Sequence, residues 1–170
     1  MKQIYLAGFD VFRPDAREHG EYLKQLCRKY GFEGMFPLDN EAPSGMHGGP
    51  LAQWICDTNL ALLRSADLVM ANLNTFRGNE PDSGTVFEVG YAVALGKPVW
   101  AYTSETRTLV GQVAIGQAND GSGPSRFVDH DGYTVEDFGM PLNLMIACTT
   151  QVITGDVEDC LRSLAAAHDG

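Results

Sequence analysis

The chain has 170 residues, of which 44% are hydrophobic and 20% are charged, and its formal net charge is −10. This length suits one domain with a full hydrophobic core, and we expect a single domain over residues 1–170. The negative charge argues against nucleic-acid binding, because phosphate backbones are bound by clustered lysine and arginine. A small neutral or cationic ligand fits this charge better than a polyanion does.

The four cysteines are scattered, without a Cys-x-x-Cys pair or a cluster at metal-ligand spacing. This pattern indicates free thiols in a reducing compartment and no metal site. The first residues lead directly into an apolar run without a signal-peptide pattern. No apolar run approaches the ~20 residues that span a bilayer. We therefore expect a cytoplasmic protein without membrane contact.

Apolar runs alternate with segments of helical periodicity along the chain. Strands are expected at 4–7, 33–38, 68–73, 99–102 and 151–154. Helices are expected at 14–30, 51–65, from Asp82 to Gly96, at 108–113, at 141–147, and after an N-capping Asp156 to residue 167. The Gly/Ser/Asn-rich stretch 116–123 predicts a mobile surface loop. The alternation predicts an α/β fold, flavodoxin-like or Rossmann-like, in which helices cover both faces of a parallel five-stranded sheet.

Several common motifs are absent. The chain lacks the glycine-rich dinucleotide fingerprint, the P-loop and the nucleophile elbow of serine hydrolases, so no cofactor is expected. The histidines, His19, His47, His130 and His168, are isolated in sequence and show no acid partner there. We expect structural or surface roles for all of them.

Two carboxylates, Asp82 and Glu88, flank the start of the helix that follows the third strand. In open α/β sheets ligands bind at the carboxyl ends of the strands, which is where this helix would begin. Both residues also have structural interpretations, which residue chemistry alone slightly favours. Asp82 suits a cap or turn, and the spacing of Thr85 and Glu88 matches a capping box. Apolar neighbours of Glu88, however, make an idle carboxylate costly, and such a group can attack a sugar carbon.

The segment 82–92 closely resembles the catalytic motif of the nucleoside 2-deoxyribosyltransferases. Further segments agree with that family in the same order: 4–8 followed by Val11 and Phe12, 37–40, 76–82 and 141–145. The resemblance implies a retaining ping-pong transfer of 2-deoxyribose between nucleobases, through a deoxyribosyl-glutamate intermediate and without cofactor or metal. It implies Glu88 as nucleophile, Asp82 as the group that holds the sugar hydroxyls, and Tyr5 as the residue that orients Glu88.

The resemblance also implies a set of substrate contacts and self-association. These contacts are Phe12, Asp39, Glu41, Asn59 and Gly84, with Asn143 and Met145 reaching into the site of a neighbouring subunit. The implied partners are deoxynucleosides, free nucleobases and further copies of the chain.

Two departures from the family pattern stand out. Asn59, which periodicity alone places on an exposed helix face, replaces an Asp that protonates the leaving base in some members. An amide cannot do so, so either the proton comes from elsewhere, from Asp39 or water, or the preferred bases differ. The tail, residues 167–170, also lacks the terminal tyrosine whose carboxylate contributes to the site in some members of the family.

Two other functions stay open at this stage. The first is hydrolysis of the N-glycosidic bond of (deoxy)nucleosides or nucleoside 5′-monophosphates on the same scaffold. Relatives that take monophosphates tend to place Ser where this chain has Asp82, because a carboxylate repels a phosphate. Ser83 and Arg77 keep that alternative open. The second is a non-catalytic nucleotide- or base-binding module, against which the intact Glu88, Asp82 and Tyr5 argue. Base preference, tolerance of a 2′-hydroxyl and the choice between dimer and hexamer are not defined by the sequence.

Overall fold

The structure, a computed structural model, describes residues 1–119, 121 and 125–168. Its centre is a parallel sheet with the strand order β2-β1-β3-β4-β7. The strands are β1 (Lys2–Ala7), β2 (Phe32–Met35), β3 (Leu68–Asn72), β4 (Val99–Thr103) and β7 (Gln151–Thr154). Five parallel strands joined by helices confirm the α/β class that the alternating pattern predicts.

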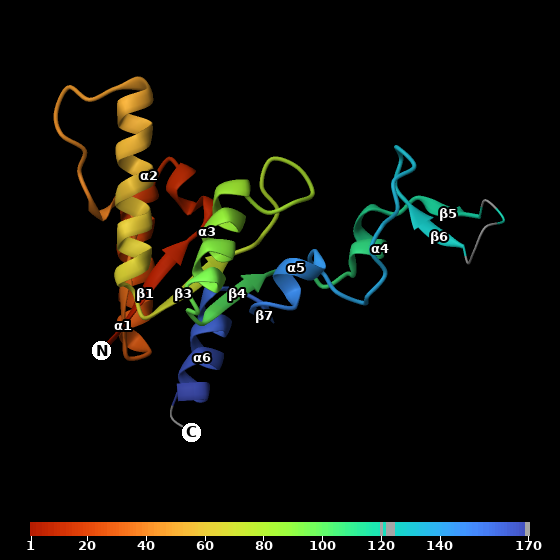
Figure 1. The fold of residues 1–170 in the computed structure, drawn as a ribbon. Helices are drawn as coiled ribbons and strands as arrows, with labels where there is room; N and C mark the ends of the chain where they lie inside the picture. Colours follow the sequence, from red (N-terminus) through yellow and green to blue (C-terminus); the bar gives the residue numbers. More distant parts are fainter. Residues whose placement is uncertain (120, 122–124, 169–170) are drawn as a thin grey trace.

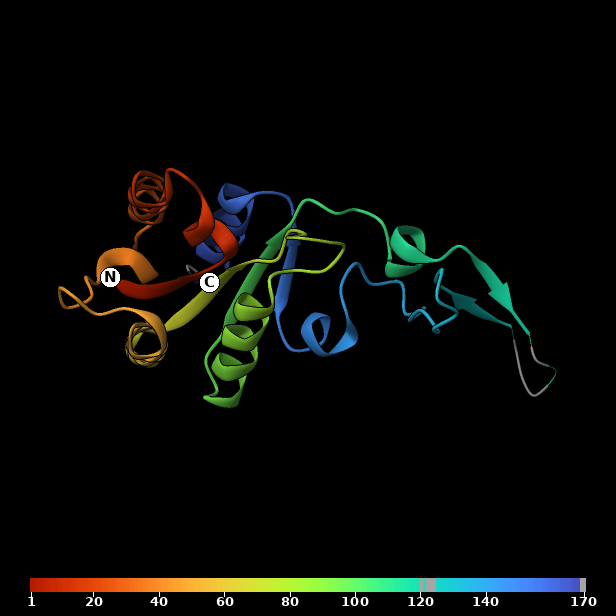
Figure 2. The ribbon, with the colours of Figure 1, turned by 90° about the horizontal axis from the view of Figure 1, so that it is seen from above.

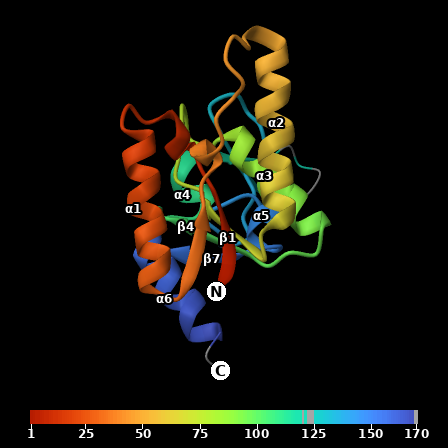
Figure 3. The same cartoon turned by 90° about the vertical axis from the view of Figure 1, so that its left-hand side faces the viewer.

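Helices form a layer on each face of the sheet (Figures 1, 2 and 3). One layer contains α1 (Ala16–Lys29) and α6 (Val157–His168). The other contains α2 (Gly48–Ser65), α3 (Ser83–Ala94) and α5 (Leu144–Ala147). Each layer packs its own cluster of buried side chains against the sheet. Asp156 accepts hydrogen bonds from two backbone amides at the start of α6, which confirms the N-cap expected there.

Strand β1 distributes its side chains between the two layers. Ile4 and Leu6 join the cluster under α1 and α6, whereas Tyr5 and Ala7 join the cluster under α2, α3 and α5. This division follows from the two-residue period of a strand, which turns successive side chains to opposite faces. Tyr5 therefore lies fully buried on the α3 side of the sheet.

The strand expected at 33–38 is shorter in the structure. β2 ends at Met35, and a short 3-10 helix, Pro37–Asp39, follows. Pro37 explains the change, because proline lacks the N–H that a sheet ladder needs. The helix expected at 51–65 begins earlier, at Gly48, and α2 extends past the ends of the strands (Figure 1). Trp54 and Ile55 lie in the half of α2 that has no sheet beneath it, and both side chains line a cavity.

The segment between β4 and α5 leaves the layers, and its described residues, 104–119, 121 and 125–143, form a projecting arm (Figures 1 and 2). It contains α4 (Leu109–Val113), as expected, and an antiparallel pair, β5 (Gly116–Ala118) and β6 (Arg126–Val128). The loop expected at 116–123 is therefore wrong over 116–118, because backbone bonds to β6 order these residues. Residues 120 and 122–124, and the chain end at 169–170, lie outside the described residues.

Two further expectations concern the whole chain. Among the described residues, no helix is long and apolar enough to span a bilayer. The assignment of residues 1–170 to one domain stays a prediction.

Candidate active site

Asp82 caps the N-terminus of α3. Its Oδ2 accepts hydrogen bonds from the backbone N–H of Thr85 at 2.9 Å and from the Thr85 hydroxyl at 3.0 Å. The expected cap role of Asp82 is thus confirmed, and the expected capping box of Thr85 and Glu88 is wrong. Asp82 already binds the amide at the third helical position, and Glu88 lies a turn further along the helix. The carboxylate of Glu88 is free for another purpose.

Glu88 accepts a hydrogen bond from the phenol of Tyr5. The Tyr5 Oη lies 2.5 Å from Glu88 Oε1. Burial raises the pKa of Glu88 to about 7, an effect that the Tyr5 hydrogen bond opposes and the nearby Asp82 carboxylate reinforces. Burial and the Glu88 charge raise the pKa of Tyr5 far above its ordinary value, so the phenol keeps its proton. Glu88 is thus poised near neutrality, where both of its protonation states are populated.

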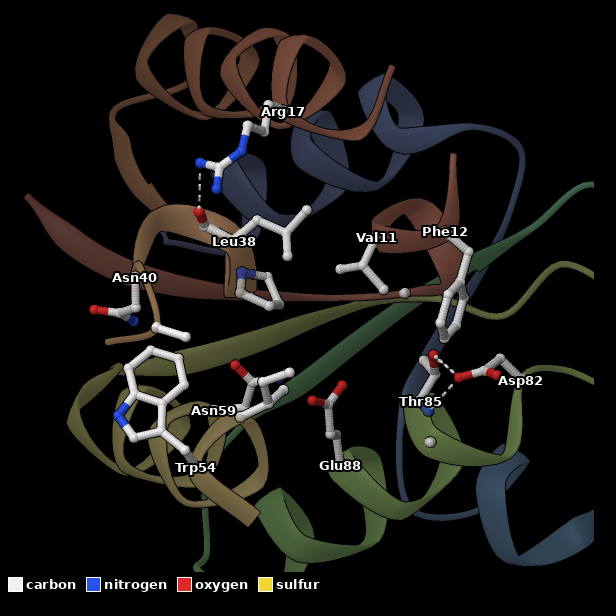
Figure 4. A pocket seen from close by; sticks show the side chains of 15 residues that line it. Val11, Phe12, Arg17, Leu38, Asn40, Trp54, Asn59, Asp82, Thr85 and Glu88 are labelled. Atoms are coloured by element: carbon white, nitrogen blue, oxygen red, sulfur yellow. Dashed lines mark hydrogen bonds between the residues drawn. The ribbon is translucent and has the colours of Figure 1, made fainter. Parts of the chain in front are cut away.

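A cavity of about 440 Å³ opens beside Glu88, at the end of the sheet where the parallel strands finish. This volume falls within the range of small-molecule sites. Figure 4 shows the carboxylate of Glu88 pointing into it. The lining residues come from the loops after β1 and β2 and from α1, α2 and α3: Gly8, Val11, Phe12, Arg17, Pro37, Leu38, Asn40, Ala42, Trp54, Ile55, Asn59, Asp82, Gly84, Thr85 and Glu88.

Most of the residues expected from the sequence meet at this cavity. Phe12, Asn59, Asp82, Gly84 and Glu88 line it, and Tyr5 reaches it through its bond to Glu88. The prediction that Asn59 lies on an exposed helix face is therefore wrong. The cause is that α2 turns this face toward the loop after β2 rather than toward solvent.

Four other expected residues lie elsewhere. The carboxylate of Asp39 accepts hydrogen bonds from the Phe36 amide and from Lys24, outside the cavity lining. Glu41 is exposed and lies 4.0 Å from Arg17. Asn143 caps α5 and donates to Glu136, and Met145 is 67% exposed; neither lines the cavity of its own chain.

The sequence did not reveal several lining residues, notably Val11, Arg17, Asn40, Trp54 and Ile55. One signal existed for α2, because Ile55 and Asn59 are one turn apart and share a helix face that mixes apolar and polar side chains. No comparable signal existed for Arg17, since an arginine on an amphipathic helix is usually a solvated surface residue.

A buried polar network holds the loop after β1. Asp10 is buried in the short 3-10 helix Phe9–Phe12, where its Oδ1 lies 3.0 Å from His19 Nε2 and its Oδ2 accepts from Asn72 Nδ2 at 2.9 Å. The expectation that no histidine has an acid partner is therefore wrong for His19, because a turn brings together residues nine positions apart. It is also wrong for the surface residue His130, which lies 3.1 Å from Asp131.

Aromatic stacking fixes Phe12 at the cavity wall. Phe76 stacks on Phe9 and on Phe12, with ring centroids 4.9 and 5.4 Å apart. The guanidinium of Arg77 lies 4.6 Å from the centroid of Phe76 and 5.2 Å from that of Phe12. Neither Arg77 nor Ser83 lines the cavity. Within the described ranges, no group of three or more His, Cys, Asp and Glu side chains could hold a metal ion.

Comparison with known proteins identifies the family of the chain. Residues 4–145 match the family Nucleoside 2-deoxyribosyltransferase, and the chain belongs to that family. A 2-deoxyribosyltransferase of Leishmania mexicana is 31% identical, with 99% of each chain covered and a TM-score of 0.77. An uncharacterized protein of Schizosaccharomyces pombe is 32% identical over 157 residues, 84% of this chain and 74% of its own length.

A 2-deoxyribosyltransferase of Bacillus psychrosaccharolyticus shares the fold. It is 19% identical, with a TM-score of 0.60 over 92% of this chain and 88% of its own. The family model that matches residues 4–145 confirms the family expected from the motif around Glu88.

Proposed function

We propose that the protein transfers a 2-deoxyribosyl group from one nucleobase to another. The observation that carries this proposal is the contact of Tyr5 Oη with Glu88 Oε1 at 2.5 Å, beside a cavity large enough for a nucleoside. Family membership and the deoxyribosyltransferase of Leishmania mexicana support the same activity. The substrates proposed are 2′-deoxynucleosides and free bases.

In the proposed first step Glu88 attacks C1′ of the deoxynucleoside. A bond forms between its carboxylate oxygen and C1′, the C1′–N bond breaks, and the electron pair leaves with the base. Tyr5 orients the carboxylate, and Asp82 accepts a hydrogen bond from a sugar hydroxyl through the oxygen that does not cap α3. A second base then attacks C1′ from the face that the first one left. The new C1′–N bond forms, the C1′–O bond to Glu88 breaks and restores the carboxylate, and the attacking base loses its N–H proton to water. Two inversions give net retention.

Asp82 bears on the choice between a nucleoside and a nucleotide. Its carboxylate lines the cavity, where it would repel the phosphate of a 5′-monophosphate. The cationic group nearest in sequence, Arg77, stacks on aromatic rings and does not line the cavity. These positions favour a free nucleoside over a 5′-monophosphate as the substrate.

We also propose that the protein self-associates and that Asn143 and Met145 of one copy contribute to the site of another. Both are exposed in the isolated chain, beside α3. Exposed apolar side chains on α3, α5 and the arm support an interface there: Phe87, Ile115, Tyr133, Phe138 and Met145. A cytoplasmic location is proposed as well, supported by four free cysteines.

The test is incubation with deoxyinosine and adenine, followed by chromatography. Deoxyadenosine is the expected product, and free deoxyribose as the only sugar product would indicate a hydrolase. Intact-mass measurement with deoxyinosine alone should find one added deoxyribosyl group on the peptide that contains Glu88. Glu88→Gln should abolish both signals, whereas Glu80→Gln, an exposed neighbour outside the cavity, should keep them. No product from any deoxynucleoside would overturn the proposal.

A further inference from the structure

The cavity has two chemically different ends. Figure 4 shows Glu88 between Asp82 on one side and Asn59 on the other, with Trp54, Asn40 and Arg17 further along that second side. Asp82 and Glu88 are the acidic residues of the lining. The end formed by Asn40, Trp54 and Arg17 therefore offers an amide, an indole N–H and a guanidinium to a ligand, and its lining contains no carboxylate. We refer to it as the donor end.

The position of Glu88 between the two ends sets the orientation of a bound nucleoside, and this step rests on the proposed function. If Glu88 attacks C1′ and Asp82 holds a sugar hydroxyl, the sugar occupies the side of Asp82. The base then extends from C1′ toward the donor end. Leu38 and Trp54 flank that space in Figure 4 and provide apolar walls for a flat heterocycle.

Arg17 presents its guanidinium at the donor end with few protein partners. It donates one hydrogen bond to the carbonyl of Leu38 at 3.3 Å and lies 4.0 Å from the carboxylate of Glu41. In the described part of the chain these are its polar contacts. A guanidinium has only donors, so its remaining N–H groups need acceptors that a ligand can supply.

We propose that Arg17 donates hydrogen bonds to the edge of the base farthest from the sugar. This contact makes the site selective for 6-oxopurines, such as hypoxanthine and guanine, over adenine. A 6-oxopurine presents two adjacent acceptors, O6 and N7, that match an arginine fork. Adenine replaces O6 with an amino group, which is a donor and cannot pair with a guanidinium. Asn40 and Asn59 do not impose this choice, because an amide can turn to donate or to accept.

The same contact favours the chemistry of the leaving group. When the C1′–N bond breaks, the electron pair remains on the base, and a 6-oxopurine spreads the negative charge onto O6. The guanidinium stabilises that charge by hydrogen bonding, and water supplies the proton that the free base finally carries. This role fits a donor end without a carboxylic acid, next to Asn59, whose amide cannot supply a proton.

The test compares wild type with Arg17→Met, which keeps an unbranched apolar stem and removes every donor. Calorimetry measures the binding of free hypoxanthine and free adenine, and exchange assays measure kcat/KM for deoxyinosine and deoxyadenosine. Arg17→Met should weaken hypoxanthine binding and deoxyinosine turnover by roughly 10- to 100-fold and change the adenine values by no more than about 3-fold. Arg28→Met, on the same helix and paired with Glu33 away from the cavity, is the matched control.

Equal losses for both bases, or a wild type that does not prefer hypoxanthine, would overturn the proposal. The side chain of Arg17 is exposed, so Arg17→Met should stay folded, and a loss of binding or turnover reports the missing guanidinium. The binding measurement needs no turnover, so it tests the role of Arg17 even if exchange fails. Absence of exchange by the wild type with every base would instead contradict the proposed function.

Discussion

The phenol of Tyr5 donates a hydrogen bond to Glu88 across 2.5 Å, although the two residues are 83 positions apart. Tyr5 is fixed by complete burial in β1, and Glu88 by its place in α3. The bond lowers the pKa of Glu88, whereas burial and the charge of Asp82 raise it to about 7. The two neighbours of Glu88 thus act on its protonation in opposite directions, which makes each of them testable.

Tyr5→Phe should reduce activity and move its pH dependence upward. The variant removes the interaction that lowers the pKa of Glu88, so a higher pH is needed to form the carboxylate nucleophile. Loss of a hydrogen bond to a charged group should lower kcat/KM by about 10- to 100-fold near neutrality. The measurement is the pH profile of kcat/KM for base exchange. Tyr30→Phe removes a comparable bond to Glu158 far from the cavity and should leave the profile unchanged. A lower or unmoved acid limb in Tyr5→Phe would contradict this role.

Asp82→Asn should move the acid limb of the kcat/KM pH profile to lower pH, opposite to the shift expected for Tyr5→Phe. Removing the Asp82 charge lowers the pKa of Glu88, so the nucleophile forms at lower pH even if the rate on the plateau falls. The α3 cap survives, because Asn is as good an N-cap as Asp. Asp82→Ala, by contrast, also loses the hydrogen bonds to Thr85 and should destabilise the fold by about 1 kcal/mol in urea titrations. Equal stabilities of the two variants would argue against the capping role.

Glu88→Gln should stabilise the fold at alkaline pH while it abolishes exchange. The folded-state pKa of Glu88, about 7, lies above its ordinary value of 4.5. Protonated Glu88 therefore favours the folded state below about pH 4.5, and this contribution is lost as pH rises through about 7. Neutral Gln avoids the loss, so the variant should gain roughly 1 to 3 kcal/mol at about pH 8 and little at about pH 5. Urea unfolding at both pH values measures the difference, with Glu80→Gln as control. A gain that is the same at both pH values would rule out titration of Glu88 as its cause.

Local sequence patterns were sufficient for the α/β sheet and for the end of the cavity that contains Asp82 and Glu88. Strand β3, the cap Asp82 and the nucleophile candidate Glu88 lie within one continuous segment, so spacing and residue type determine their arrangement. The donor end is different, because Arg17, Asn40 and Trp54 come from three separate segments. Their meeting depends on how far α2 extends beyond the sheet, which periodicity does not encode. Asp39 shows the same limit, since its ion pair with Lys24 removes it from the cavity.

The proposed self-association through α5 predicts that two inactive variants can restore activity together. If Asn143 of one copy completes the site that holds Glu88 of another, Glu88→Gln and Asn143→Ser damage opposite halves of a shared site. Asn143→Ser is suitable because Ser still caps α5, although its side chain reaches less far. Each variant alone should be nearly inactive and folded, and sedimentation should show an oligomer in both.

Mixing equal amounts of the two variants, followed by subunit exchange, should rebuild intact sites in the mixed assemblies. In a two-fold dimer half of the molecules are mixed and each has one intact site, so about a quarter of the wild-type activity should return. Glu88→Gln mixed with Tyr5→Phe is the control, because both changes affect the same half of the site and no site in that mixture is fully intact. Full activity of Asn143→Ser alone, or a mixture no more active than its components, would place Asn143 outside the site and leave its role to the α5 cap and the bond to Glu136.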